Sequence, residues 1–271
     1  MTEEYRENAW QRALDQLRAG RNRPCRAIGE LPPSVSPTNV SEAMKLQDAL
    51  NQRLVADGFG MIVGTKIGCT TRIMQDYLGM EHPCSGAIFD STLFTETGVY
   101  DFDSFLRVGV ECEIAVTLGE SIPVSLSAHT LESVSHAIAS VHAAIEIVDD
   151  RYHDFENRIP DGYTWLADDF FGAGAVLGTA VTDWKPLDLP SIRGTMLIDG
   201  QDVGSGFGRD IINGHPLEAL VWLANEQSLR GHEIPAGWVV MLGSVVQTKW
   251  ISAGQKVEVD IEGLGSAAAQ F

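Results

Sequence analysis

From Gly60 onward the sequence is a succession of short apolar segments that are rich in β-branched residues and separated by glycines. Short runs of this kind, bounded by turn-forming residues, are typical of β-strands. The segments with this pattern are MIVGTKIG, VECEIAVTL, AIEIVDD, AGAVLG, GTMLIDG, WVVMLG and KVEVDIEG. We expect a body that is mostly β-sheet. Because no flexible linker or internal repeat interrupts the pattern, this body is expected to be one domain.

Before this region, apolar residues recur at helical rather than strand spacing. One helix is predicted over residues 3–19, and a second begins after an N-cap at Asn39 or Ser41. A polar, proline-rich connector separates the two helices. We therefore expect a small helical cap segment at residues 1–59 and a catalytic domain at residues 60–271.

Two stretches with helical periodicity interrupt the β pattern. The first runs from about Leu131 to His142, and the second runs from Pro216 to Leu229. Each has apolar residues three and four positions apart, which predicts an amphipathic helix with one buried face. The expected architecture therefore combines separate helices with a mostly β body.

The charge of the chain argues against two classes of partner. The sequence has 19 Lys and Arg residues against 37 Asp and Glu residues, a formal net charge of −18. This charge repels phosphate backbones and anionic lipid surfaces, so we expect neither nucleic acid nor a membrane as a partner. The four cysteines have no Cys-x-x-Cys spacing, and no charged-then-apolar leader opens the chain. Free thiols and a cytoplasmic location are therefore expected.

Glutamates stand inside two of the most apolar segments, Glu111 and Glu113 in VECEIAVTL and Glu146 in AIEIVDD. Successive side chains of a strand point to opposite faces, so Glu111 and Glu113 share one face at a spacing of about 6.6 Å. Carboxylates on a buried face need a positive partner, and a cation that prefers oxygen ligands, Mg²⁺ or Mn²⁺, is the natural candidate. The same alternation also fits a strand with one solvated face.

Lys66 lies between glycines in the segment GTKIGCT. Glycines on both sides would let a ligand approach the backbone closely. Beside a metal-bound anion, the ammonium could donate a hydrogen bond to a developing enolate or relay a proton. The alternative is an ordinary lysine whose ammonium reaches the surface. Asp168 and Asp169, which precede two phenylalanines, could also reach a pocket.

Five segments, in the same order, give the chain a family resemblance. They are GTKIGCT, VECEIAVTL, AIEIVDDR, NGHPLEALVWLANE and the closing IEGLGSAAAQF. These segments resemble the hydratase/decarboxylase branch of the fumarylacetoacetate hydrolase superfamily, which includes 2-oxopent-4-enoate hydratase and 4-oxalocrotonate decarboxylase. The resemblance implies an α+β fold, namely a mixed β-roll with a small helical N-terminal cap, that assembles into homo-oligomers. It also implies that Glu111, Glu113 and Glu146 bind the metal and that Lys66 is the active-site lysine.

The activity implied by the resemblance is that of a lyase dependent on Mg²⁺ or Mn²⁺. A hydratase of this type adds water to a 2-hydroxy-dienoate or 2-oxo-enoate and gives a 4-hydroxy-2-oxo acid during catabolism of a ring compound. A decarboxylase of a 2-oxo-enedioate, of the 4-oxalocrotonate type, is the nearest alternative. A non-catalytic partner subunit of such an enzyme is the other alternative. A carbon–carbon hydrolase is disfavoured, because no clear His–Glu pair stands in the N-terminal part of the sequence.

The sequence departs from the family pattern at two places. The stretch FDS stands where many relatives carry two acids, and ADDFF stands where relatives often read ADNAS. We predict Asp90 and Asp169 among the catalytic residues, with Ser91 and Phe171 in the substrate pocket. Since these positions are expected to surround the far end of the substrate, we also expect a substrate that is longer or more apolar than pentadienoate.

Overall fold

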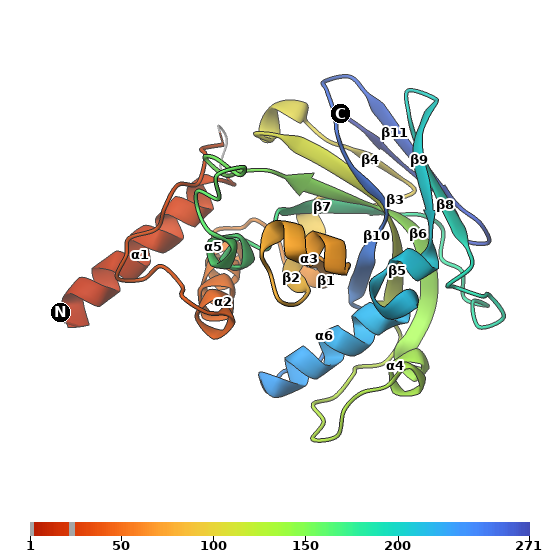
Figure 1. Ribbon diagram of the computed structural model, residues 1–271, viewed down its shortest axis with the longest axis horizontal. Helices are drawn as coiled ribbons and strands as arrows, with labels where there is room; N and C mark the ends of the chain where they lie inside the picture. The colour runs from red at the N-terminus through yellow and green to blue at the C-terminus, as the bar shows by residue number, and fades with distance from the viewer. Residues whose placement is uncertain (1–2, 22–24) are drawn as a thin grey trace.

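The computed structural model describes residues 3–21 and 25–271 (Figure 1). Its helices are α1 (Glu3–Ala19), α2 (Val40–Ala56), α3 (Arg72–Leu78), α4 (Leu131–Ala137), α5 (Gly162–Ala167) and α6 (Leu217–Leu229). Its strands are β1 (Ile62–Gly68), β2 (Cys84–Phe89), β3 (Leu93–Thr95), β4 (Thr97–Val99), β5 (Val108–Leu118), β6 (Ile138–Asp149), β7 (Gly172–Leu177), β8 (Arg193–Ile198), β9 (Gln201–Phe207), β10 (Val239–Trp250), β11 (Lys256–Ile261) and β12 (Gly265–Gln270).

The strands form two mixed sheets. The larger sheet has seven strands in the order β2-β1-β10-β5-β6-β7-β3, and the smaller has five in the order β4-β12-β11-β8-β9. Neighbouring strands are antiparallel except for three pairs, β1 with β10, β3 with β7, and β4 with β12. The long strands β5 and β6 occupy the middle of the larger sheet, which curves around them (Figure 1). The prediction of an α+β fold with a mixed β-roll is confirmed.

The hydrophobic interior has two main parts. The larger cluster fills the space between the two sheets and extends to α6. The second cluster joins α1 and α2 to α5 and includes Tyr152, Trp165 and Phe171. Figure 1 shows these helices together on the side of the roll that carries the N-terminus. The N-terminal helices therefore share their core with residues that follow β6, and the expected division at residue 59 stays a prediction.

Local capping explains where α2 begins. The Asn39 side chain accepts a hydrogen bond from the Glu42 backbone N–H at 3.0 Å, and the Glu42 carboxylate accepts one from the Thr38 backbone N–H at 2.9 Å. These two bonds satisfy donors that a helix start would otherwise leave unpaired. Asn39, and not Ser41, is therefore the N-cap.

The helix predicted to end at His142 is shorter than expected. α4 ends at Ala137, and Ile138 already begins β6. Val141, which the helical spacing placed on an inward face, instead pairs with Val116 of β5. Because the ladder with β5 satisfies the backbone groups of this segment, the extended conformation is favoured over a longer helix. The prediction of a helix over residues 138–142 is wrong.

The other predicted helices are confirmed at residues 3–19 and 217–229. Pro216 stands just before the second of these, where its missing N–H removes no helical hydrogen bond. Across residues 3–21 and 25–271, no helix is both long enough and apolar enough to cross a membrane.

Candidate metal centre

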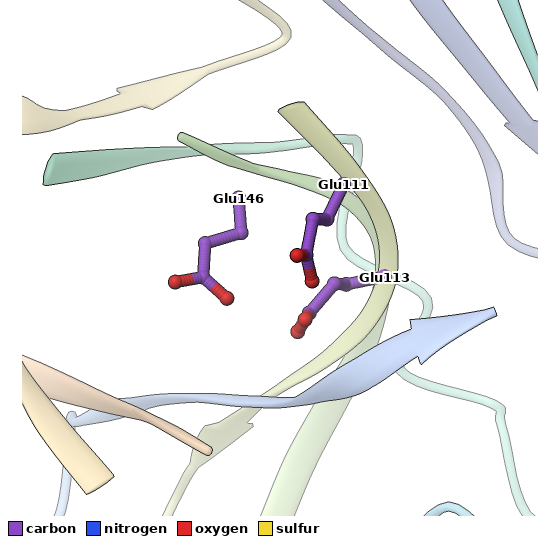
Figure 2. A group of neighbouring side chains, drawn as sticks. All are labelled: Glu111, Glu113 and Glu146. Carbon is purple, nitrogen blue, oxygen red and sulfur yellow. The ribbon is translucent and has the colours of Figure 1, made fainter. Parts of the chain in front are cut away.

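Three glutamates converge on the inner face of the larger sheet. Glu111 on β5 lies directly opposite Glu146 on the antiparallel strand β6, while Glu113 lies opposite Ala144. One carboxylate oxygen from each glutamate lies within 4.8 Å of the others. Figure 2 shows the three carboxylates pointing toward one another inside the curve of the sheet. The alternation of side chains along β5 therefore places two carboxylates on the face predicted from sequence, and register with β6 adds the third.

The carboxylates are buried but incompletely hydrogen-bonded. Glu113 and Glu146 are 1% and 2% exposed. Oε2 of Glu113 accepts a hydrogen bond from the Gly243 backbone N–H at 3.0 Å, and Oε1 of Glu111 accepts one from the Thr248 hydroxyl. The buried Oε1 of Glu113, in contrast, has no hydrogen-bond partner among the described residues. A buried carboxylate oxygen without a partner is costly unless a cation or a proton binds it.

The electrostatics of the trio favour a bound positive charge. Burial and the charge of Glu146 together raise the pKa of Glu111 to about 7, against the opposing effects of the Thr248 hydroxyl and Lys66. Burial and the two neighbouring carboxylates raise the pKa of Glu113 well above its ordinary value. Glu111 and Glu113 therefore hold protons more readily than ordinary carboxylates when no metal is bound, and a divalent cation would replace those protons. Three carboxylates suit Mg²⁺ or Mn²⁺, which prefer oxygen ligands.

Lys66 on β1 lies at the edge of the trio. Its Nζ atom is 3.0 Å from Oε1 of Glu146, and only 4% of its side chain is exposed. Burial alone would lower the pKa of Lys66, but the three glutamate charges outweigh burial and raise it above its ordinary value. Lys66 is therefore a buried cation and not a surface lysine.

Glycine and phenylalanine shape the space around Lys66. The Nζ atom lies 5.0 Å from the centroid of the Phe170 ring, within the range of a cation–π contact. A Cβ atom added at Gly68 would lie 2.9 Å from that ring and 3.2 Å from Nζ of Lys66. Residue 68 must therefore remain glycine for the lysine and the ring to keep their positions.

Asp169 is buried, and both of its carboxylate oxygens have hydrogen-bond or ion-pair partners. Its Oδ1 accepts hydrogen bonds from the Asn51 side chain at 2.9 Å and from the Ala87 backbone N–H at 3.0 Å. Its Oδ2 pairs with Arg21 at 2.9 Å. Arg21 also contacts Asp168, so this aspartate pair connects the end of α1 to the turn before β7. These contacts hold a turn in place, and a catalytic role for Asp169 stays a prediction.

Phe170 and Phe171 point in different directions. Asp169, Phe170 and Phe171 all have positive φ angles, of 53°, 45° and 66°, which form a tight left-handed turn. Phe171 packs edge-on against Tyr152, with ring centroids 4.8 Å apart, inside the second hydrophobic cluster. Phe170 belongs to the same cluster and also lies against Lys66. The aromatic residue beside Lys66 is thus Phe170, and not Phe171 as the sequence indicated.

Asp90 and Ser91 begin a short exposed turn after β2. Oδ1 of Asp90 accepts a hydrogen bond from the Met61 backbone N–H at 3.0 Å. Ser91 lines a cavity of about 210 Å³ with several aromatic side chains, among them Phe89 and Tyr100. Neither this cavity nor a second one of about 540 Å³ beside α2 includes the three glutamates among its described lining residues. A place in the substrate pocket for Ser91 stays a prediction.

Thr248 and Gly243 were not indicated by the sequence. Both lie on β10, which pairs with β5 through three register shifts. These irregularities decide which β10 groups face the glutamates. No residue pattern in the segment predicts the register shifts. The only sequence signal for Phe170 was its place in the unusual ADDFF stretch.

The chain is similar to several known proteins. Residues 97–271 match the model of the Fumarylacetoacetate (FAA) hydrolase C-terminal family. The chain is 30% identical over 271 residues to 2-keto-4-pentenoate hydratase from Paraburkholderia xenovorans, covering 100% of this chain and 96% of the relative. It is 31% identical over 230 residues to 2-hydroxyhexa-2,4-dienoate hydratase from Comamonas testosteroni, covering 84% of this chain and 82% of the relative.

A solved structure extends the similarity to the whole fold. The structure of 4-oxalocrotonate decarboxylase from Pseudomonas putida G7, complexed with magnesium and adipate, has a TM-score of 0.88 with this chain. The two sequences are 28% identical, and the match covers 98% of each chain. The likeness therefore includes the N-terminal helices as well as the β-roll.

Proposed function

Because this chain belongs to the fumarylacetoacetate hydrolase family, we propose that it is a metal-dependent lyase that adds water to a 2-hydroxy-dienoate or 2-oxo-enoate. The product would be a 4-hydroxy-2-oxo acid, in the catabolism of a ring compound. One observation carries this proposal: three carboxylates, two of them fully buried, converge beside a buried lysine, and one carboxylate oxygen has no partner among the described residues. The hydratase names of the two curated relatives favour hydration as the reaction.

Glu111, Glu113 and Glu146 would hold Mg²⁺ or Mn²⁺ in this proposal. The donor set consists of hard carboxylate oxygens, and the magnesium complex of the Pseudomonas putida decarboxylase is the structural precedent. When bound, the ion would supply Lewis acidity to the carboxylate and C2 oxygen of a 2-oxo acid.

Lys66 would position and protonate the substrate. Its ammonium is held by Glu146 at 3.0 Å and stays charged, so it can donate a hydrogen bond to an anionic oxygen. It could also deliver a proton to a carbon of the dienol at the step that makes the oxo-enoate. Phe170 covers one side of the ammonium and keeps water from that side. We thus place the reacting carbons beside the carboxylate trio, within reach of the Lys66 ammonium.

A direct assay tests the proposal. The purified protein with Mg²⁺ is expected to consume 2-hydroxypenta-2,4-dienoate or a longer homologue, followed by the loss of dienol ultraviolet absorbance, with the 4-hydroxy-2-oxo acid identified by mass spectrometry. A chelator is expected to abolish turnover, and added Mg²⁺ or Mn²⁺ to restore it. Turnover that is unaffected by exhaustive chelation would contradict a role for the trio in the reaction.

The pKa shifts predict how pH acts on the metal-free protein. Since burial raises the pKa of Glu111 to about 7 in the folded state, that state binds more protons than the unfolded chain from the ordinary value of 4.5 up to about 7. Stability is therefore highest below this window and falls as pH rises through it, by at most about 1.4 kcal/mol per pH unit for one proton. Denaturant midpoints measured from pH 4.5 to 8 after chelation test this.

The Glu111→Gln variant is the matched control for this pH dependence, because it cannot titrate at that position. The difference in stability between the wild-type protein and the variant should decrease as pH rises through the window. The affinity for Mg²⁺ should rise over the same window in the wild-type protein, because metal must displace protons. A difference in stability that does not change with pH, together with pH-independent binding of Mg²⁺, would contradict the raised pKa of Glu111.

The decarboxylase is the nearest alternative, and the match over 98% of both chains with the Pseudomonas putida enzyme favours it. Incubation with a 2-oxo-enedioate distinguishes the two reactions. Release of CO₂ at a rate above that of hydration would assign the chain to the decarboxylases. Hydration without CO₂ would support the proposal made here.

A non-catalytic partner subunit is the other alternative, suggested by the unusual ADDFF stretch. Purification of the chain alone in the presence of Mg²⁺ decides this point. Full turnover without a second protein would exclude it. Assembly into homo-oligomers is proposed from the family alone and can be measured in the same preparation by light scattering.

We expect the substrate to be longer or more apolar than pentadienoate. The turn after α5 presents the ring of Phe170 to Lys66, so the wall of the site at this point is apolar. An alkyl or aryl tail would gain from burial against such a wall, by about 0.8 kcal/mol for each methylene group. A panel of dienoates of increasing tail length should give a rising kcat/KM. The highest kcat/KM for pentadienoate itself would refute this expectation.

A further inference from the structure

Two cysteine thiols meet beside Lys66. Cys69 directly follows β1, and Cys84 is the first residue of β2, opposite Gly68 in the antiparallel pair of these strands. The thiol of Cys84 donates a hydrogen bond to the sulfur of Cys69. Facing residues of antiparallel strands, and their close neighbours, have Cα separations in the range of about 4.4–6.8 Å that a disulfide spans. The register thus places the two cysteines at neighbouring positions on adjacent strands.

The surroundings give the two thiols different roles. Cys69 and Cys84 are 8% and 1% exposed, and both belong to the hydrophobic cluster that contains Phe170. The hydrogen bond from Cys84 and the ammonium of Lys66 lower the pKa of the Cys69 thiol, against the effect of burial. Burial raises the pKa of the Cys84 thiol. Cys69 is therefore the nucleophile, and Cys84 is the protonated thiol next to it.

We propose that Cys69 and Cys84 form an oxidative modification site, in which a peroxide converts the hydrogen-bonded dithiol into a disulfide. In the first step the Cys69 thiolate attacks hydrogen peroxide, the O–O bond breaks, and hydroxide leaves a sulfenic acid on Cys69. In the second step the sulfur of Cys84 attacks that sulfenic acid, and the hydroxyl group leaves as water. Two thiols and one peroxide thus give one disulfide and two waters. This inference is independent of the proposed hydratase activity.

The disulfide would act on the site through Gly68 and Lys66. Cys69 is separated from Lys66 by two residues, and the Gly68 backbone lies close against both Phe170 and the Lys66 ammonium. A covalent bond that draws the β1 end toward β2 must move this backbone, since the surrounding core is closely packed. If the protein has the proposed activity, we expect oxidation to lower turnover at least about tenfold, because small displacements of positioning groups are costly. A thiol reductant should restore it.

Peptide mapping tests the proposal without any assay of activity. Trypsin cleaves after Lys66, Arg72 and Arg107, so Cys69 and Cys84 fall in separate peptides unless a disulfide joins them. After treatment of the full-length protein with one equivalent of hydrogen peroxide and alkylation in denaturant, we expect the joined peptides in the mass spectrum. We also expect the loss of two of the four thiols. Both changes should reverse with dithiothreitol.

Single substitutions provide the controls. Cys25→Ser should behave as the wild-type protein does, because Cys25 lies elsewhere and donates to the Ser104 carbonyl at 2.8 Å. Cys84→Ser should give no joined peptide and should leave Cys69 as a sulfenic acid that dimedone traps. The proposal is overturned if peroxide modifies Cys25 before Cys69, or if the wild-type protein yields no peptide joined through Cys69 and Cys84. These results are read from the wild-type protein and stand whether or not the chain is a hydratase.

Discussion

Replacement of Glu113 by glutamine is expected to abolish turnover without unfolding the domain. The substitution removes the ligand atom that has no other partner, Oε1, and leaves an amide oxygen that can still accept the hydrogen bond from Gly243. We expect kcat to fall by at least about 10³-fold, because a lost ligand displaces the ion that would polarise the substrate. The dissociation constant for Mg²⁺, measured by calorimetry, should rise by more than about 100-fold.

The fold should tolerate this change because the surroundings of Glu113 favour the protonated form of its carboxyl group when no metal is bound. Burial and the neighbouring carboxylates raise its pKa well above the ordinary value, so glutamine imitates the protonated form. The denaturant midpoint of the metal-free variant should therefore match or exceed that of the wild-type protein. Glu132→Gln on exposed α4 is the matched control and should change neither kcat nor metal binding. A fully active Glu113→Gln protein would remove the trio from the mechanism.

Replacement of Lys66 by methionine is expected to separate chemistry from metal binding. Methionine fills much of the volume of the buried side chain but carries no ammonium, so the ion pair with Glu146 at 3.0 Å is lost. We expect kcat to fall by about 10²–10⁴-fold, the usual contribution of a positioned proton donor. The affinity for Mg²⁺ should be unchanged or higher, because one competing positive charge has been removed from the carboxylates.

Two further variants make the Lys66 result specific. Lys66→Ala should lose turnover as Lys66→Met does, although it also leaves a cavity that lowers stability. Lys185→Ala, on an exposed loop, should retain wild-type kinetics and serves as the control. If Lys66→Met turned over substrate at the wild-type rate, the lysine would be only a structural counter-charge of Glu146.

The seven segments named from sequence correspond to β1, β5, β6, β7, β8, β10 and β11, because each of these strands contains an apolar run bounded by glycine or another turn-forming residue. The remaining strands, β2, β3, β4, β9 and β12, were not predicted. The failures have local causes. At Ile138 and Val141 the apolar spacing fits a helix and a strand equally well, and pairing with β5 decided the outcome. The short helices α3 and α5 have only 7 and 6 residues, too few for a helical period to be recognised.

The face that carries Glu111 and Glu113 could be predicted because it depends only on alternation along one strand. Glu111 and Glu113 share a face in any regular strand, whichever partners it pairs with. The contacts of Thr248 depend on the register shifts in β10, and those of Phe170 depend on three consecutive left-handed residues. Register between distant strands and backbone irregularities of this kind are not predicted by any periodic pattern of residues. For this reason the position of the glutamates could be predicted from the sequence, and the groups around them could not.

The ion pair between Lys66 and Glu146 has a consequence for how the protein reaches its working state. A buried carboxylate without a positive partner would resist closure of the pocket, whereas the ammonium of Lys66 provides a positive charge beside Glu146 from the moment β1 joins the sheet. Folding can then finish before any ion arrives, in contrast to small zinc modules that collapse only around their metal. Such a protein can lose and regain its ion in the folded state, and the occupancy of the site would follow the free ion concentration around it.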